Sequence, residues 1–322
     1  MSNILILGRK EIRDAIRSRR FLVLVLILSG ALVTSVWIGS LSFGIKMHDY
    51  NLYLNALPAQ LKAQALKSPQ LFPLTLLRGG LEYLEILGAL FAFLIGYSSI
   101  ARERSSGTSL LLLSRPVSKN EIFLGKVFGL STVWLAVLIV NFLAAILALL
   151  TIGNARMALI DYERILITLF FTFIYLLFWT TLAVLLGAQF QRPVRAIYVG
   201  ISLWLTTVLI LPQIGDTMDP DNQVPGGLFA SLGIAKSNEI AVLSHFHTFD
   251  VIRNGIEVSS ITKLFERIAF AFLGIKDRYN QLPLRPVFGA MNTSIIGIIG
   301  FLTAIFVLAI YLTKSTKFLR RS

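Results

Sequence analysis

The chain has 322 residues, of which 55% are hydrophobic and only 15% are charged, and its mean hydropathy is +0.74. Soluble globular proteins are typically about 45–50% apolar and about 25% charged, so this composition argues against a soluble enzyme, a disordered protein and a nucleic-acid-binding domain. The absence of cysteine excludes disulfides, thiolate metal sites and a cysteine nucleophile.

Residues 1–20 are expected to form an amphipathic helix, because their apolar and basic side chains separate on a helical wheel. The apolar arc holds Ile4, Leu5, Gly8, Ile12, Ala15 and Ile16, and the basic arc holds Arg9, Lys10, Arg13, Arg17 and Arg20. This pattern is typical of a helix that lies in the membrane interface. Two interpretations stay open: a plain orientation signal, or an interface helix that also contacts a cytosolic partner.

Six stretches are long and apolar enough to cross a bilayer, which takes about 20 residues. They cover residues 21–43, 84–100, 127–152, 165–188, 194–211 and 294–312. The first is too long for the apolar region of a signal peptide and lacks a following cleavage site, so we expect it to remain as a span. Pro193 suits the first turn of the fifth, which predicts a tight hairpin between the fourth and fifth spans around residues 189–195.

The basic residues predict the orientation. The segments 1–20, 101–126, 189–195 and 313–322 hold 17 of the 30 lysines and arginines but only 4 of the 17 acidic residues. The whole net charge of +13 therefore falls on one side, which is expected to be cytosolic. Orientation and contact with anionic lipids account for this charge, and no nucleic acid is expected as a partner. The expected fold is all-α: a polytopic membrane protein with six transmembrane helices, cytosolic N- and C-termini and an amphipathic interface helix over 1–20 before a transmembrane domain over 21–322.

Two longer segments are expected on the opposite side. Residues 44–80 are predicted to be a loop with a short helix over 58–66. Residues 212–290 open with a turn-rich stretch, and apolar residues then recur at helical spacing over 261–272. This spacing predicts an amphipathic helix that lies on the outer leaflet or caps the spans. His245 and His247 are weak candidates for a metal site, since His-x-His can ligate a metal; the simpler interpretation is a polar surface loop, and no metal is expected.

Three polar residues near the spans are candidates for a pathway or an outer gate, because ionisable groups are costly in lipid. Glu82 and Glu85 lie one helical turn apart at the outer end of the second span, and Arg78 is placed to pair with Glu82. The alternative for both is a helix end in the headgroup region. Asn141, in the third span, is expected either to bond another helix or to line a cavity.

The loop over 101–126 has the most specific pattern. Gly107 interrupts the helix, a run of leucines follows, and Arg115-Pro116 forces a turn because the residue before proline avoids the helical region. Ser118 and Glu121 predict a capping box that starts the next helix. The expected shape is a compact helix–turn–helix whose apolar surface needs a partner.

This loop resembles that of the ABC type-2 permeases, the membrane subunits of ABC exporters. The shared pattern is Glu103-Arg104-x-x-Gly107-Thr108, an apolar run, Arg115-Pro116-Val117-Ser118 and Gly125-Lys126, and the opening Gly8-Arg9-Lys10-Glu11-Ile12-Arg13-Asp14 is similar to the start of the same family. The branch it most resembles includes permeases linked to multi-copper enzyme maturation and to gliding machinery. The resemblance covers the six-span layout and both cytosolic segments, but neither 44–80 nor 212–290.

The resemblance implies a homo- or heterodimer docked on two separate ATPase subunits, which would bind ATP and Mg while this chain binds no cofactor and has no catalytic residue. Carried over by position, the candidates for docking and coupling are Arg9, Lys10, Glu11, Arg13, Arg17, Arg102, Glu103, Arg104, Gly107, Arg115, Pro116 and Lys119. The alternative for each is a loop or cap residue without a partner contact.

No stretch matches the phosphate-binding pattern G-x-x-x-x-G-K-[ST], so we expect any ATPase to be a separate chain. The predicted function is a permease subunit, in the plasma membrane of a bacterium or archaeon, that couples ATP hydrolysis by its partner to export or force transmission. The alternative is an ATP-independent scaffold or receptor that binds an extracytoplasmic partner through 212–290. A secondary transporter is disfavoured, because no internal repeat is evident and buried charges are few.

Overall fold

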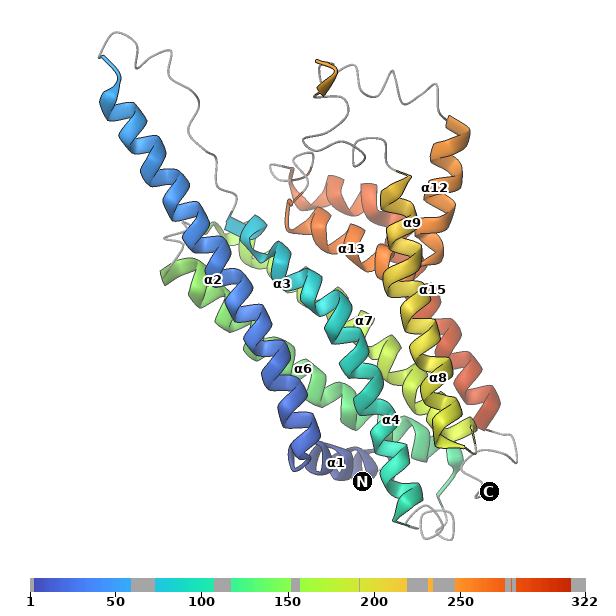
Figure 1. Ribbon diagram of the computed structural model, residues 1–322. Coiled ribbons are helices and arrows are strands. Elements are labelled where there is room, and N and C mark those ends of the chain that lie inside the picture. The colour runs from blue at the N-terminus through green and yellow to red at the C-terminus, as the bar shows by residue number, and fades with distance from the viewer. Residues whose placement is uncertain are drawn as a thin grey trace.

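The computed structural model describes residues 3–58, 73–106, 117–151, 157–190, 192–218, 231–233, 247–275, 279 and 282–313 (Figure 1). The main elements are α1 (Asn3–Ile16), α2 (Arg19–Ala56), η2 (Pro73–Leu77), α3 (Arg78–Tyr83), η3 (Leu84–Gly88), α4 (Ala89–Ser105), α6 (Lys119–Thr151), α7 (Leu159–Gln189), α8 (Pro193–Trp204), η4 (Leu205–Ile210), α9 (Leu211–Thr217), α12 (His247–Ser259), α13 (Ile261–Phe272) and α15 (Leu284–Thr313). All of them are helical, and the described residues contain no strand.

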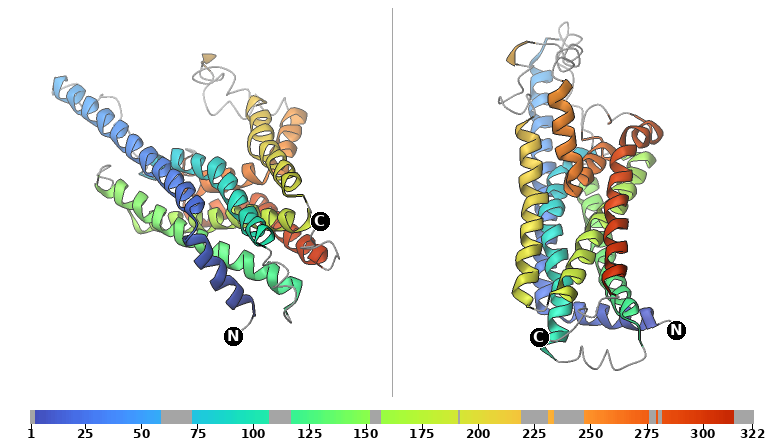
Figure 2. Two further views of the ribbon diagram at one scale, coloured as in Figure 1. Left: turned by 60° about the horizontal axis from the view of Figure 1, so that its bottom comes forward. Right: turned by 90° about the vertical axis from the view of Figure 1, so that its right-hand side faces the viewer.

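Six helical segments are long and apolar enough to cross a membrane, which confirms the predicted all-α fold with six spans. They are Arg19–Ala56, Leu74–Ser105, Lys119–Thr151, Leu159–Gln189, Val194–Thr217 and Leu284–Thr313. The spans run side by side, with α1 across one end of the bundle and α13 across the other (Figures 1 and 2). We call these the α1 end and the α13 end. The last residue of α15 also lies at the α1 end, where the Thr313 hydroxyl bonds the side chain of Asn120.

The first span is longer than its sequence predicts. Residues 44–56, expected to open a loop, continue α2 as helix, and Leu57 then adopts the extended conformation that Pro58 imposes on the residue before it. The 38 residues of α2 correspond to about 57 Å, against about 30 Å of hydrocarbon core, so its last turns stand beyond the core at the α13 end. The short helix predicted over 58–66 lies outside the described residues except for Pro58.

The second span starts ten residues before the predicted position of 84, at Leu74, and its first turns include the charged residues Arg78 and Glu82. Arg78 and Glu82 satisfy each other there, with Nε 2.9 Å from Oε1. Gly79 and Gly80 let this part of the span approach α2, where their neighbours are side chains such as Ser35 and Leu32. The predicted Arg78–Glu82 pair is thus confirmed, within helix rather than loop.

Two π-helical segments, η3 and η4, lie against each other inside the bundle. A π turn leaves backbone carbonyls without their usual helical partner, and side chains from other elements bond them here. Tyr175 donates its hydroxyl to the Glu85 carbonyl at 2.8 Å, and Trp204 donates its indole N–H to the Ile86 carbonyl at 3.2 Å. Ser260 donates to the Thr207 carbonyl of η4 at 2.6 Å. These bonds fix α7, α8 and the start of α13 around the second span.

The amphipathic helix predicted over 261–272 forms as α13 and caps the spans. It is buried between α7 and α15, and its Phe265 ring stacks on Tyr175 with centroids 4.7 Å apart. Arg164, 3% exposed, binds the end of α13 and the chain that follows it through three carbonyls. They belong to Phe272 (3.2 Å), Tyr279 (3.2 Å) and Leu282 (2.6 Å).

Ion pairs join α9, α12 and α13 into a cap over this end. Lys263 pairs with Asp216 of α9 and with Glu266, each at 2.7 Å. Burial lowers the pKa of Lys263, but these two carboxylates raise it by more, so the net pKa lies above its ordinary value. Glu257 of α12 pairs with Arg267 and Arg253. Burial raises the pKa of Glu257, but the two arginines lower it by a larger amount, so the net pKa is below its ordinary value.

Replacing Tyr175 with Phe should lower stability by about 1 kcal/mol, since the hydroxyl bonds both the Glu85 carbonyl and Thr262 while the ring can stay in place. Thermal unfolding of the purified protein in detergent measures the loss. Tyr198→Phe is the matched control, because this side chain is 68% exposed. Equal stability of the two variants would contradict a structural role for the Tyr175 hydroxyl.

Candidate functional site

At the α1 end, α1 packs directly against α6 at a set of glycines. A methyl group at Gly129 would lie 2.5 Å from the Gly8 carbonyl oxygen, and one at Gly125 would lie 2.6 Å from Cβ of Leu7. Gly125 and Gly129 are four residues apart, so they share one face of α6 and let the two backbones approach closely. The amphipathic helix predicted for residues 1–20 therefore exists, but one side of it is packed on the bundle.

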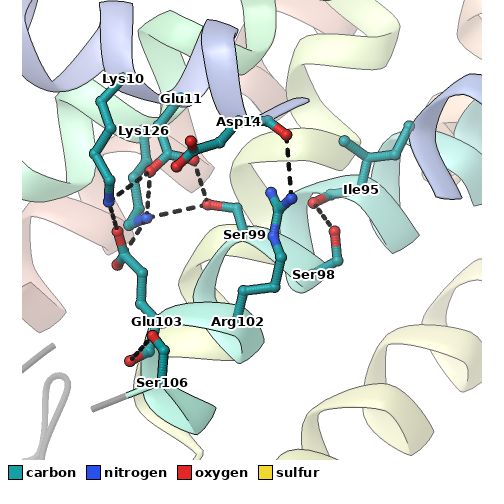
Figure 3. Close-up of polar contacts among 10 residues, drawn as sticks. All are labelled: Lys10, Glu11, Asp14, Ile95, Ser98, Ser99, Arg102, Glu103, Ser106 and Lys126. Carbon is teal, nitrogen blue, oxygen red and sulfur yellow. Dashed lines mark hydrogen bonds and ion pairs between the residues drawn. The ribbon is translucent and has the colours of Figure 1, made fainter. Parts of the chain in front are cut away.

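The close approach brings together charges from three elements, drawn in Figure 3. Lys126 of α6 places Nζ 2.7 Å from Glu11 of α1 and 2.8 Å from Glu103 of α4. Ser99 accepts from Lys126 at 3.1 Å and donates to Glu11 at 2.9 Å. Lys10 completes the set through Glu103 at 2.5 Å. We call these five residues the charge cluster.

Three charged members of the charge cluster are nearly closed to solvent, since Lys126 is 2% exposed, Glu11 3% and Glu103 6%, whereas the Lys10 side chain is 40% exposed. Removing one partner from a buried ion pair costs about 3–5 kcal/mol, because the remaining charge stays buried without compensation. Two lysines and two glutamates balance in number. Burial lowers the pKa of Lys10, but its bond to Glu103 and the nearby acidic charges raise it by more, so the net pKa is above its ordinary value. The cluster is therefore a fixed ionic joint between α1, α4 and α6.

Two members of the charge cluster, Lys126 and Ser99, were not among the predicted site residues. One signal was present in the sequence: Glu11 falls on the apolar arc of the first helix, next to Gly8 and Ala15, and all three are buried. An acidic residue on a buried face requires a cation from another element, and Lys126 follows Gly125 in the motif that carried the family resemblance.

The opposite face of α1 is open. Arg9, Arg13 and Arg17 are exposed, and so are the apolar side chains of Leu5 and Ile16. This face mixes basic and apolar groups, as expected for a helix at a membrane surface. The predicted docking residues of this segment thus form two groups: Lys10 and Glu11 in the charge cluster, and three outward arginines, of which Arg17 lies just past the end of α1.

The remaining docking candidates lie at the ends of α4 and α6. Arg104 donates to the Ala188 carbonyl at 2.8 Å and also to the Phe190 carbonyl, so it ties the end of α7 to α4. Arg102 donates to the Asp14 carbonyl at 3.2 Å, which links α4 to α1 (Figure 3). Lys119 is the first residue of α6. Three further candidates, Gly107, Arg115 and Pro116, lie outside the described residues.

The predicted capping box at the start of α6 is confirmed. The Ser118 backbone donates to Glu121 at 2.8 Å, and the Glu121 backbone donates back to the Ser118 hydroxyl at 3.2 Å. Asn3 of α1 donates to the same Glu121 at 3.0 Å. The cap thus joins the beginning of α1 to the beginning of α6.

A charged cavity of about 550 Å³ lies beside the charge cluster. Its lining is Lys10, Glu11, Asp14, Arg17, Ser18, Ser99, Arg102, Glu103, Ser105 and Ser106. The groups come from α1, the α1–α2 turn and the end of α4. A polar or charged segment of another protein would find partners of both signs here.

The candidates for a pathway or an outer gate lie in different surroundings. Glu82 is half-exposed in its pair with Arg78, whereas Glu85 is buried, 7% exposed, in the η3 segment beside α13. Asn141 donates to the Val137 carbonyl of its own helix at 2.8 Å and lines an apolar cavity of about 30 Å³. The part of these three residues in a pathway or gate stays a prediction.

The weak metal candidates stay undetermined. His245 lies outside the described residues, and His247 is the first residue of α12. Within the described part of the chain, no three His, Cys, Asp or Glu residues gather closely enough to hold a metal ion.

Comparison with known proteins gives a family and two relatives. The sequence profile of the ABC-2 family transporter proteins matches residues 5–321. The chain is 27% identical over 149 residues to a probable ABC transporter permease protein NosY of Stutzerimonas stutzeri, which covers 46% of each chain. It is 26% identical over 146 residues to the probable ABC transporter permease protein NosY of Pseudomonas aeruginosa, which covers 45% of each. The matched part of the chain spans about half the length of these relatives.

Gly129→Ala should loosen α1, because its methyl group would meet the Gly8 carbonyl and neither backbone can yield without separating the helices. Hydrogen exchange should show faster exchange across α1 with the spans little changed. Gly300→Ala is the matched control, since nothing lies within 4 Å of that position. Unchanged protection of α1 would contradict the glycine contact.

Lys126→Met should destabilise the protein by about 3–5 kcal/mol, since Glu11 loses its buried cation. Adding Glu11→Gln should recover part of the loss by removing the uncompensated charge. Arg78→Met, which breaks an exposed pair, should cost about 0–1 kcal/mol. Denaturation in detergent measures all three, and equal losses for Lys126→Met and Arg78→Met would rule out the ionic joint.

Proposed function

The chain belongs to the ABC-2 transporter family, and we propose that it is the permease subunit that turns ATP hydrolysis in separate ATPase subunits into movement of its spans. The movement would serve export of a substrate or transmission of force across the membrane. The charge cluster carries this proposal, because it makes α1, α4 and α6 respond together to a push on α1. A coupling device needs such a rigid link between its docking surface and its spans.

The docking surface for the ATPase would comprise the outward face of α1 and the charged cavity. Arg9, Arg13 and Arg17 offer positive charge there, and the cavity adds Asp14 and Arg102. Their place at the α1 end agrees with a cytosolic location, since the basic excess of the sequence falls in the segments at this end. The ATPase would bind ATP and Mg, and this chain would contribute no catalytic group.

Movement would pass from the α1 end to the α13 end along the second span. Glu103 and Ser99 anchor α4 in the charge cluster, and the same continuous helical segment reaches Glu85 in η3. Gly96 seats α4 against α7, because a methyl there would lie 2.8 Å from the Ala183 side chain. A π segment has weaker helical bonding and is a suitable hinge. ATP would drive the change only if the ATPase contacts α1 differently in its two states.

A second permease copy would complete the unit. The fifth span packs on the bundle mainly through one stripe of residues and leaves exposed polar side chains such as Ser202, Thr206 and Gln213 along its length. Polar groups facing outward from a span favour a protein neighbour over lipid.

The plasma membrane of a bacterium or archaeon is the proposed location. The segment 212–290 is the proposed contact for an extracytoplasmic partner.

The test is purification of the tagged chain from its own cells in mild detergent. We expect an ATPase with a phosphate-binding loop to co-purify in stoichiometric amount and to hydrolyse ATP. Arg9→Glu combined with Arg13→Glu should lower the amount of co-purified ATPase at least tenfold. Both side chains are exposed, so reversing their charge leaves the charge cluster intact. Arg78→Glu, at the α13 end, should leave retention unchanged. A wild-type protein that holds only extracytoplasmic partners would favour the scaffold or receptor instead.

A further inference from the structure

A large cleft lies at the α1 end between α2, α4 and α8, next to the charge cluster but separate from it. Its volume is about 1020 Å³, at the upper limit of ordinary ligand pockets. The lining is Ser18, Arg19, Arg20, Phe21, Val23, Leu24, Leu94, Ile95, Tyr97, Ser98, Ala101, Arg102, Ser105 and Ile197. The proposed docking surface shares Arg102 with this cleft but uses none of its other arginines.

The lining changes character along the bundle axis. Arg19 and Arg20 begin α2, and Arg102 and Ser105 end α4, so the polar groups gather at the α1 end of the cleft. From there α2 continues forward along the chain, and α4 is followed backward along the chain, toward the middle of the bundle. The lining of the cleft becomes apolar in that direction. The deeper lining includes Phe21, Leu24, Leu94, Ile95 and Ile197. One end of the cleft is therefore suited to a charged group and the other to hydrocarbon.

The charge of the lining has one sign. Three arginines contribute to it and no aspartate or glutamate does. The neighbouring cavity differs, because Glu11, Asp14 and Glu103 balance its cations. Arginine forms bidentate bonds with phosphate, and anionic lipids concentrate in the leaflet that faces basic segments.

We propose that this cleft binds an anionic phospholipid of the adjacent leaflet, with its phosphate among Arg19, Arg20 and Arg102 and its acyl chains along the apolar wall of α2, α4 and α8. A free phosphate ion would use the arginines but not the wall. The site does not depend on an ATPase partner, so it stands or falls apart from the proposed function.

The experiment uses the purified, delipidated full-length protein and native mass spectrometry. Phosphatidylglycerol and phosphatidylcholine with identical acyl chains are the probes. We expect retention of phosphatidylglycerol, and binding about thirtyfold weaker in Arg19→Gln combined with Arg20→Gln, as follows from about 1 kcal/mol for each arginine. The matched control is Arg192→Gln with Arg195→Gln, two exposed arginines at the same end that lie outside the cleft. It should bind like the wild type.

A second variant tests the apolar wall without altering charge. Leu94→Trp should fill part of the space beside the apolar wall and weaken phosphatidylglycerol binding about tenfold. This variant keeps the test decisive if the arginine variant fails to fold. Equal weakening by the two arginine pairs would overturn the proposal in favour of general surface attraction. Displacement of the lipid by millimolar inorganic phosphate would overturn it in favour of a simple anion site.

The remaining competitor for the cleft is a second copy of the chain. The protein has no cysteine, so Leu24→Cys gives a single reactive thiol on the cleft wall. Failure of this thiol to cross-link two copies supports the lipid. Efficient disulfide formation between copies in the membrane would show that protein fills the cleft and would overturn the proposal.

Discussion

The arrangement of the α1 end depends on the pairing of one buried charge, the ammonium group of Lys126. A lysine inside a helical bundle is stable only when carboxylates reach it, and Glu11 and Glu103 do so from two other elements. For Glu11 to arrive, the backbone of α1 must lie against α6. The glycines at 8, 125 and 129 permit that approach. On each helix, the charged residue of the ion pair therefore lies within one turn of a glycine that permits the close contact. Glu11 lies near Gly8 on α1, and Lys126 lies between Gly125 and Gly129 on α6.

This joint divides α1 into two faces with different roles. The buried face is committed to the bundle, so only the outward arginines remain for a partner. The second span carries the consequence to the other end, where Tyr175 and Trp204 bond the carbonyls that its π segment frees. In the proposed mechanism, a displacement at α1 would therefore reach π segments, in which the usual helical bonding of the backbone is interrupted.

Features set by local periodicity were predictable from the sequence. The six spans, the first helix, the Ser118–Glu121 cap and the helix over 261–272 all follow from hydropathy, wheel position or a two-residue motif. Features set by tertiary pairing were not. The first turns of the second span pack on α2 through Gly79 and Gly80, which is a contact between helices, whereas the Arg78–Glu82 pair inside them is a local i,i+4 contact that the sequence did predict. The role of Lys126 was missed because its partners are 115 and 23 positions away in the sequence, beyond the reach of any local pattern.

The balance of charge in the cluster also decides what a mutation there can reveal. With two lysines and two glutamates, any single neutralisation leaves one charge of the cluster in excess, and a reversal leaves two. Glu103 is 6% exposed, so reversing its charge would disturb folding before it could report on docking. Arg9 and Arg13 are free of this ambiguity, because they share the helix with Glu11 but face away from it. The outward arginines of α1 and the ionic joint can therefore be tested separately, although both include residues of the same helix.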